Sequence, residues 1–238
     1  MKIARHWLDL TLALLFVVSL AAVLLAHESD FLRKPFCAAV PACPAVDHAA
    51  AWNKIAYDLG IGGLTSLLFY GLLVRLPDWR RRRRIRRSLS GRYLAFKKDM
   101  IATMLGVADG SYDYDLVERL VDLKEFKDYF KERVGSDQER WHRFLNNLEE
   151  HNIRDMLTAM EIFRADVTHV MLTTDIEDFE ASEFFKRLSA LIYSHKDATT
   201  EYDPVKQLSQ FLWNVFAGWD WVSGYRQRDI VQDMIDSI

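Results

Sequence analysis

Two long apolar segments near the start of the chain dominate its hydrophobic pattern. The first runs from Trp7 to Ala26 and the second from Ile55 to Leu76, and each is about 20 residues long. At a rise of about 1.5 Å per residue, a helix of this length crosses a hydrocarbon core about 30 Å thick. The pattern therefore predicts two transmembrane helices that form a hairpin, with residues 27–53 connecting them outside the bilayer.

The first apolar segment has a basic start, at Lys2 and Arg5, which secretory signal peptides share. However, its apolar part is longer than the roughly 7 to 15 residues of a signal peptide. Leu24 and Ala26 would also make a poor cleavage site. We therefore expect that this segment is retained as a helix.

A run of arginines follows the second apolar segment. It consists of Arg80, Arg81, Arg82, Arg83, Arg84, Arg86 and Arg87. Because basic residues flank membrane helices mainly on the cytoplasmic side, the run predicts that both termini lie in the cytoplasm. We expect the setting to be the bacterial inner membrane, with the arginines at the lipid headgroups.

Beyond the arginine run, apolar residues recur at helical spacing to the end of the chain. Residues 79–105 predict a basic amphipathic linker helix, whose apolar stripe is formed by Ile85, Leu89, Tyr93, Phe96, Met100 and Met104. Further on, Ser136 and Glu139 have the spacing of a capping box, which predicts one long helix that continues to Val170.

The expected fold class is all-α, in three parts. Residues 1–78 form the transmembrane hairpin, residues 79–105 the linker helix, and residues 106–238 a cytoplasmic helical bundle. The bundle has about 130 residues, which is long enough to bury a core of its own. The sequence shows no alternating strand pattern, glycine-rich phosphate loop or internal repeat.

Charge is distributed unevenly along the chain, whose formal net charge is −3. Residues 80–99 hold 10 basic side chains and one acidic side chain, whereas residues 100–238 hold 15 basic and 27 acidic side chains. Because phosphates are bound by cations, the acidic part argues against direct binding of nucleic acid. It suits a basic cytoplasmic protein as partner, or solubility alone.

Both cysteines, Cys37 and Cys43, lie in the segment that connects the two apolar stretches. Since this segment is predicted to face an oxidising compartment, we expect a small disulfide loop. Two unpaired thiols are one alternative. A metal site is the other, but it would need two more ligands, and only His27 and His48 lie nearby.

The second apolar segment carries three glycines, Gly60, Gly63 and Gly71, on one side of the predicted helix. Small residues let a neighbouring helix approach closely in a membrane. We therefore predict a packing face for the first apolar helix or for another copy of the chain. The alternative is that glycine is simply common in membrane helices.

Aromatic residues gather near the end of the chain. The group comprises Trp213, Phe216, Trp219, Trp221 and Tyr225. These side chains could pack between the last two helices. Alternatively, Trp213, Trp219, Trp221 and Tyr225 could form a surface on which a partner docks, because exposed Trp and Tyr are common in binding hot spots.

No catalytic constellation emerges from the sequence, so we expect neither an enzyme nor a cofactor. The seven histidines are scattered and form no metal-binding pattern. One local match is Arg164 and His169, separated by four residues, which resembles the Arg-x4-6-His signature of HEPN ribonucleases. The resemblance implies action on an RNA phosphodiester, usually across a dimer. Ala165 replaces the polar residue that usually follows the arginine in that family.

The short external loop, the second apolar segment, the arginine run and the helical cytoplasmic part form one layout. The second segment ends Phe69-Tyr70-Gly71-Leu72-Leu73-Val74-Arg75-Leu76-Pro77. This layout resembles the two-transmembrane effectors found beside bacterial retrons and in related anti-phage systems. The resemblance implies a toxic effector that a reverse transcriptase and its RNA–DNA hybrid hold inactive, and that damages the inner membrane after infection.

The mechanism we expect is self-association, because one hairpin cannot enclose a pore. Two alternatives remain. The first is a non-toxic membrane scaffold or regulator that recruits a basic cytoplasmic protein. The second is a membrane-anchored ribonuclease that uses Arg164 and His169.

Overall fold

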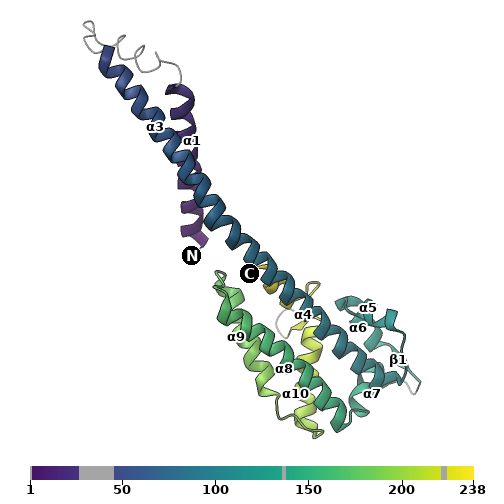
Figure 1. Cartoon of the computed structure of the whole chain (residues 1–238). Helices are drawn as coiled ribbons and strands as arrows, with labels where there is room; N and C mark the ends of the chain where they lie inside the picture. The colour runs from purple at the N-terminus through teal and green to yellow at the C-terminus, as the bar shows by residue number, and fades with distance from the viewer. Residues whose placement is uncertain (1, 27–45, 136–137, 221–223) are drawn as a thin grey trace. The chain divides into compact units, whose positions relative to one another are not determined.

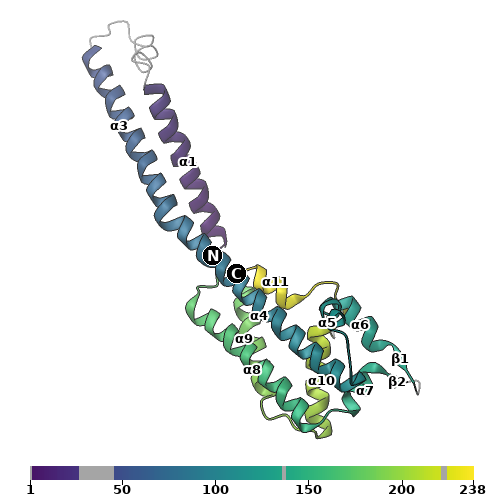
Figure 2. The same ribbon diagram turned by 45° about the vertical axis from the view of Figure 1, so that its right-hand side comes forward.

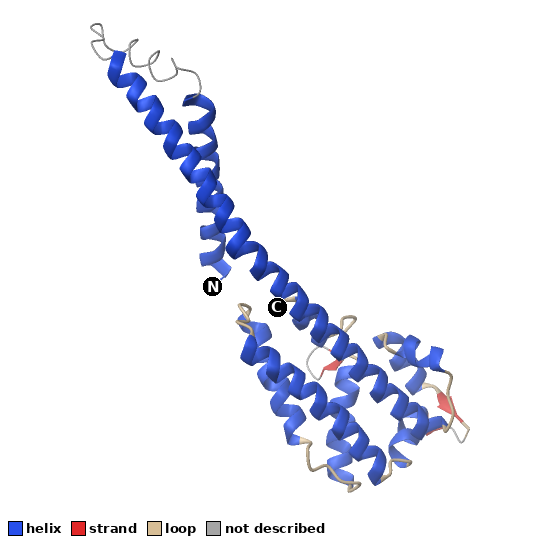
Figure 3. Ribbon diagram, in the orientation of Figure 1, coloured by secondary structure: helices blue, strands red, loops and turns tan. Residues whose placement is uncertain are grey.

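The computed structural model describes residues 2–26, 46–135, 138–220 and 224–238. The chain divides into two compact units, Met1–Arg81 and Arg82–Ile238. In both units the described residues are mostly helical (Figure 3), which confirms the predicted all-α class.

The first unit contains two antiparallel helices that lie side by side (Figures 1 and 2). They are α1 (Lys2–Ala26) and α3 (Val46–Tyr70). A single π-helical turn, η1 (Gly71–Arg75), follows α3 and leads directly into α4 (Leu76–Asp109). The long helical stretch that results holds the second predicted span and the arginine run.

Among the described residues, one helix is long and apolar enough to cross a membrane, Lys54–Asp109. Only 6% of its apolar window is buried inside the protein, whereas the core helix of a soluble domain would be mostly buried. The apolar part of α1 that the structure describes, Leu10–Leu24, is shorter. The predicted hairpin of two membrane-crossing helices is therefore not confirmed. The described residues contain one candidate span.

The second unit is built around the C-terminal part of α4. Leu89, Tyr93, Phe96, Met100 and Met104 are each at most 5% exposed, so the predicted apolar stripe is buried from Leu89 onward, whereas Ile85 is half-buried. This differs from the expected division, in which residues 79–105 formed a separate linker helix. The apolar residues of this stripe belong to one hydrophobic core together with residues from the other helices of the domain.

Seven further helices and two short strand pairs complete the described part of this unit. The helices are α5 (Tyr114–Leu120), α6 (Leu123–Lys131), α7 (Arg140–Asn146), α8 (Glu150–Thr173), α9 (Phe179–Ser194) and α10 (Tyr202–Phe216), and α11 (Ile230–Asp236) lies beyond the second strand pair. The antiparallel pairs are β1 (Arg133–Val134) with β2 (Gln138–Glu139), and β3 (Trp219–Asp220) with β4 (Gly224–Tyr225). Strands of two residues are too short to show the alternation that identifies a strand in a sequence.

The long helix expected to open at Ser136 and Glu139 is two helices instead. Glu139 is the N-cap of α7 but makes no side-chain capping bond, and Ser136 lies outside the described residues. The chain leaves the helix after Asn146 and starts α8 at Glu150, where the Asn152 side chain accepts a hydrogen bond from the Glu149 N–H (3.1 Å). A capping interaction therefore exists, but it lies 13 residues further along than predicted, at Glu149 and Asn152 in place of Ser136 and Glu139.

Aromatic side chains tie the helices of the second unit together. The rings of Phe96 on α4 and Phe163 on α8 stack with centroids 4.9 Å apart. Phe126 on α6 contacts both Phe130 (4.5 Å) and Phe216 on α10 (5.4 Å). Offset and tilted ring pairs of this kind stabilise a core beyond the burial of apolar area.

Candidate functional site

The glycines of the second predicted span do not all have the same surroundings. A Cβ atom added at Gly60 would lie 2.8 Å from Cγ2 of Val23 and 2.9 Å from the carbonyl oxygen of Ser19, both on α1. A Cβ at Gly63 would collide with the Ser19 hydroxyl. At Gly71 an added Cβ meets nothing within 4 Å. Two of the three predicted positions thus lie against α1, whereas Gly71 faces open space among the described residues.

The arginine run has a contact that the sequence did not indicate. Arg82 Nη2 donates a hydrogen bond to Oε1 of Glu177 at 2.7 Å, and the Arg82 side chain is only 17% exposed. Glu177 lies in the connection between α8 and α9. Arg83, Arg84 and Arg87 are exposed. The run can therefore serve lipid headgroups and also hold part of the helical domain.

The predicted docking residues near the C-terminus are partly used for packing. The half-buried Trp213 lies with its ring centroid 4.7 Å from that of Trp141, in the core. Trp219 packs edge-on against Tyr225 (4.9 Å), and Tyr225 is 37% exposed. Trp221 lies outside the described residues. The placement of Trp213 favours packing, and an exposed aromatic face remains at Tyr225.

A basic ridge borders that aromatic face. The ammonium groups of Lys127 and Lys131 on α6 lie 5.0 Å and 4.6 Å from the centroid of the Tyr225 ring. Cations over an aromatic face are attracted by the negative charge of the ring surface. These contacts hold β4 against α6, so they explain the conformation of Tyr225 without any partner.

A buried polar cluster joins α4 to the start of α11, and sequence reasoning missed it. Lys97 is 3% exposed, and its Nζ lies 3.0 Å from Oδ2 of Asp229 and 2.6 Å from the carbonyl oxygen of Val121. The Tyr93 hydroxyl donates to the same carboxylate at 2.9 Å. Burial raises the pKa of Tyr93, and the Asp229 carboxylate raises it further.

Asp229 in this cluster is also the N-cap of α11. Its Oδ1 accepts hydrogen bonds from the N–H groups of Val231 (3.1 Å) and Gln232 (3.2 Å). The cluster therefore fixes α11 to the central helix, and its groups satisfy one another. A signal for it existed in the sequence, because Lys97 follows Tyr93 by four residues and so lies on the buried side of a helix.

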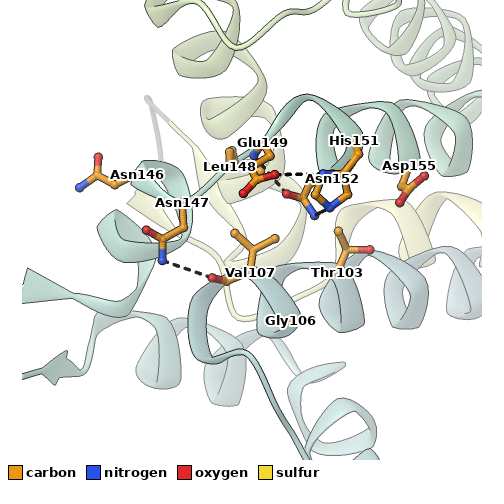
Figure 4. Close-up of a pocket in the computed structure, with 10 residues that line it drawn as sticks. All are labelled: Thr103, Gly106, Val107, Asn146, Asn147, Leu148, Glu149, His151, Asn152 and Asp155. Atoms are coloured by element: carbon orange, nitrogen blue, oxygen red, sulfur yellow. Dashed lines mark hydrogen bonds and ion pairs between the residues drawn. The ribbon is translucent and has the colours of Figure 1, made fainter.

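A cavity of about 750 Å³ lies between the end of α4 and the α7–α8 connection (Figure 4). It is lined mainly by polar side chains, and these bond to one another. Asn147 Nδ2 donates to the carbonyl oxygen of Val107 (3.4 Å), and a ring nitrogen of His151 lies 3.3 Å from a Glu149 carboxylate oxygen. Asn152 Nδ2 and the other His151 nitrogen are 3.0 Å apart. These are the contacts of a helix start.

The Arg164 and His169 pair does not converge on one point. Both oxygens of the Glu161 carboxylate accept hydrogen bonds from the Arg164 guanidinium, at 2.5 Å and 2.7 Å. His169 is exposed on the same helix. At about 100° per residue, five residues place the two side chains about 140° apart around the axis. Within one chain, the pair therefore cannot act together on one phosphodiester.

We expect that replacing His169 by alanine does not change cell growth relative to the wild-type chain, because this side chain is exposed and does not meet Arg164. The measurement is growth after induction of the wild-type chain and of His169→Ala at matched expression. Arg154→Ala serves as the control, since it removes another exposed side chain of α8. Loss of the effect in His169→Ala alone would favour the ribonuclease alternative.

No group of three or more His, Cys, Asp or Glu side chains that could hold a metal ion occurs in the described part of the chain. Cys37 and Cys43, for which a disulfide was predicted, lie outside the described residues. Comparison of the chain with protein-family models, with curated proteins and with solved structures gives no match.

Proposed function

We propose that this chain is an integral protein of the bacterial inner membrane that acts as an effector in anti-phage defence. Both α1 and α3 lie in the bilayer in this proposal, and both termini face the cytoplasm. The helical domain docks a cytoplasmic partner, such as a reverse transcriptase. Release from that partner lets hairpins associate, and their association perturbs the membrane.

The membrane location rests mainly on the exposed apolar surface of α3 and η1. Leu59, Leu68 and Leu73 are 70%, 58% and 71% exposed, and the arginine run follows this surface within a few residues. Leaving apolar area in water is unfavourable by about 25 cal/mol per Å². A bilayer removes this penalty, and the arginines then meet the anionic headgroups of the cytoplasmic leaflet.

The effector action is supported by the layout of the chain and by its resemblance to retron-associated effectors. Self-association needs a face that α1 does not use. Added Cβ atoms at Gly62 and Gly71 would meet nothing within 4 Å, so the backbone of a second copy could approach there. Gly60 and Gly63 already serve the contact inside one hairpin.

The test is to express the chain without any partner and to follow the membrane potential with a voltage-sensitive dye. We expect depolarisation and growth arrest after induction. The matched control is Leu68→Arg, which places a charge in the span and disfavours insertion by about 2.5–3.5 kcal/mol. Normal potential and normal growth at good expression of membrane-inserted protein would overturn the effector proposal.

One observation favours a second candidate, a membrane scaffold that recruits a basic protein. Residues 100–238 carry 27 acidic against 15 basic side chains. A surface with this excess attracts basic partners and accelerates their association. A pull-down that returns one stoichiometric basic partner, together with no growth defect on overexpression, would favour the scaffold over the effector.

A further inference from the structure

Two apolar side chains protrude from one end of the helical domain. Leu172, near the end of α8, is 81% exposed, and Phe179, the first residue of α9, is 76% exposed. The next most exposed Leu, Ile, Val or Phe side chain of this unit, among the described residues, is Ile162 at 59%. Large apolar side chains that are exposed together are typical of a surface that binds a protein or a membrane.

The connection that Leu172 and Phe179 flank is held in place on both sides. Ile176 in this connection packs against the core of the domain. Its neighbour Glu177 accepts the hydrogen bond from Arg82 at 2.7 Å. The α8–α9 connection is therefore held to Arg82 of the arginine run.

The chain itself limits how far this connection can lie from the bilayer. Arg82 follows Leu76, where the second predicted span ends, and both residues belong to α4. A helix rises about 1.5 Å per residue, so the six steps between them span at most about 9 Å along the bilayer normal. With Leu76 at the edge of the hydrocarbon core, Arg82 lies within or just outside the headgroup layer, which extends about 5–8 Å beyond that core on each side.

We propose that Leu172 and Phe179 insert into the cytoplasmic interface of the bilayer, so that the helical domain rests on lipid at the α8–α9 connection. The ligand is a lipid surface with anionic headgroups. This inference rests on the proposed membrane location of α3, and it is independent of any effector action.

Two acidic residues of the connection have partners within the domain. Glu177 is paired with Arg82, and Asp178 caps α9 by accepting a hydrogen bond from the Glu180 N–H at 3.0 Å. Asp175 is the one exposed acidic residue of the connection, whereas the run that holds Arg82 carries seven arginines. The arginines of this run attract anionic lipid.

A second copy of the chain is a less suitable occupant for the same reason. Two copies that met through their α8–α9 connections would bring two arginine runs together. Like charges that face each other across an interface disfavour association. Anionic lipid headgroups carry the opposite charge to the arginines, so they attract this surface, whereas the arginines of a second copy would repel it.

The experiment places one nitroxide label at a time on the full-length chain in vesicles of phosphatidylcholine and phosphatidylglycerol. Cys37→Ser and Cys43→Ser provide the background, and the labelled variants are Leu172→Cys and Phe179→Cys. Accessibility of each label to oxygen, which concentrates in lipid, is compared with its accessibility to a water-soluble nickel complex. Leu68→Cys in the span and Ile162→Cys on α8, about 15 Å from Leu172 along the helix, are the reference positions.

We expect the ratio of oxygen to nickel accessibility at residues 172 and 179 to exceed that at residue 162 several-fold, and to approach that at residue 68. Ratios at 172 and 179 equal to that at 162, with residue 68 deep in lipid, would overturn the inference alone. A water-exposed residue 68 would overturn the membrane location and this inference together. Spin–spin broadening, with neither reagent reaching 172 and 179, would assign the surface to a second copy and also overturn it.

Discussion

Replacing Lys97 by methionine is expected to lower the free energy of unfolding of the helical domain by about 3 kcal/mol. Lys97 is almost fully buried and faces the Asp229 carboxylate at 3.0 Å. Methionine has a similar length but no charge, so the carboxylate loses the cation that compensates for its burial. The expected loss is at the low end of the range for broken buried ion pairs, because Tyr93 and two backbone N–H groups still donate to Asp229.

Lys98→Met is the matched control for this substitution. Lys98 pairs with Glu118, but its side chain is 25% exposed and that of Glu118 is 46% exposed. A surface pair of this kind contributes little to stability, because water screens the two charges. Denaturant unfolding of the full chain in detergent, followed by tryptophan fluorescence, measures both variants. Similar midpoints for Lys97→Met and Lys98→Met would show that the buried pair does not secure α11.

The double variant Lys97→Met with Asp229→Asn separates the charge from the cap. Asparagine is as good an N-cap as aspartate but carries no charge. The double variant is therefore expected to recover part of the stability that Lys97→Met loses. If the double variant lost more free energy of unfolding than the two single variants lose together, the result would contradict our explanation. That explanation is that Lys97→Met is destabilising because it leaves the Asp229 carboxylate buried without a cation.

Replacing Gly60 by leucine is expected to push α1 and α3 apart, with a cost of about 1–3 kcal/mol to their packing. Even a Cβ atom at this position would lie within 3 Å of Val23 and of the Ser19 backbone. The Ser19 carbonyl belongs to a helix and cannot turn away, so α1 must move.

Gly62→Leu is the control, because a Cβ there meets nothing within 4 Å although the residue lies in the same helix. Pulsed electron paramagnetic resonance between labels at Leu15 and Leu68, both exposed, reports the separation of the two helices. The distance should increase in Gly60→Leu and stay unchanged in Gly62→Leu. An unchanged distance in both variants would remove the claim that Gly60 sets the approach of α1.

The sequence was most informative where a local pattern and its structural role coincide. Helical spacing predicted the buried stripe from Leu89 to Met104, and small residues predicted that Gly60 and Gly63 lie at a helix contact. The role of that stripe was not predictable in the same way. Whether a stripe on a basic helix meets lipid or a domain core depends on segments far along the chain.

The features that were missed depend on distant contacts or on single residues. Lys97 and Asp229 are 132 residues apart, so no spacing rule could pair them. The break at Asn147 lies inside a run whose apolar residues keep a helical period, and periodicity cannot detect one turn that leaves the helix. The contact between Arg82 and Glu177 is also long-range, and a charge run by itself does not identify which arginine has a protein partner.

The sharing of α4 between the two units has a consequence for how such a protein can evolve. Its apolar stripe from Leu89 to Ala108 is among the most deeply buried parts of the domain, yet it continues the helix that begins at Leu76. Recombination inside that stretch would separate the domain from its own core. An ancestor that exchanged its first unit for another segment could have done so only upstream of Leu89, with the central helix inherited as part of the domain.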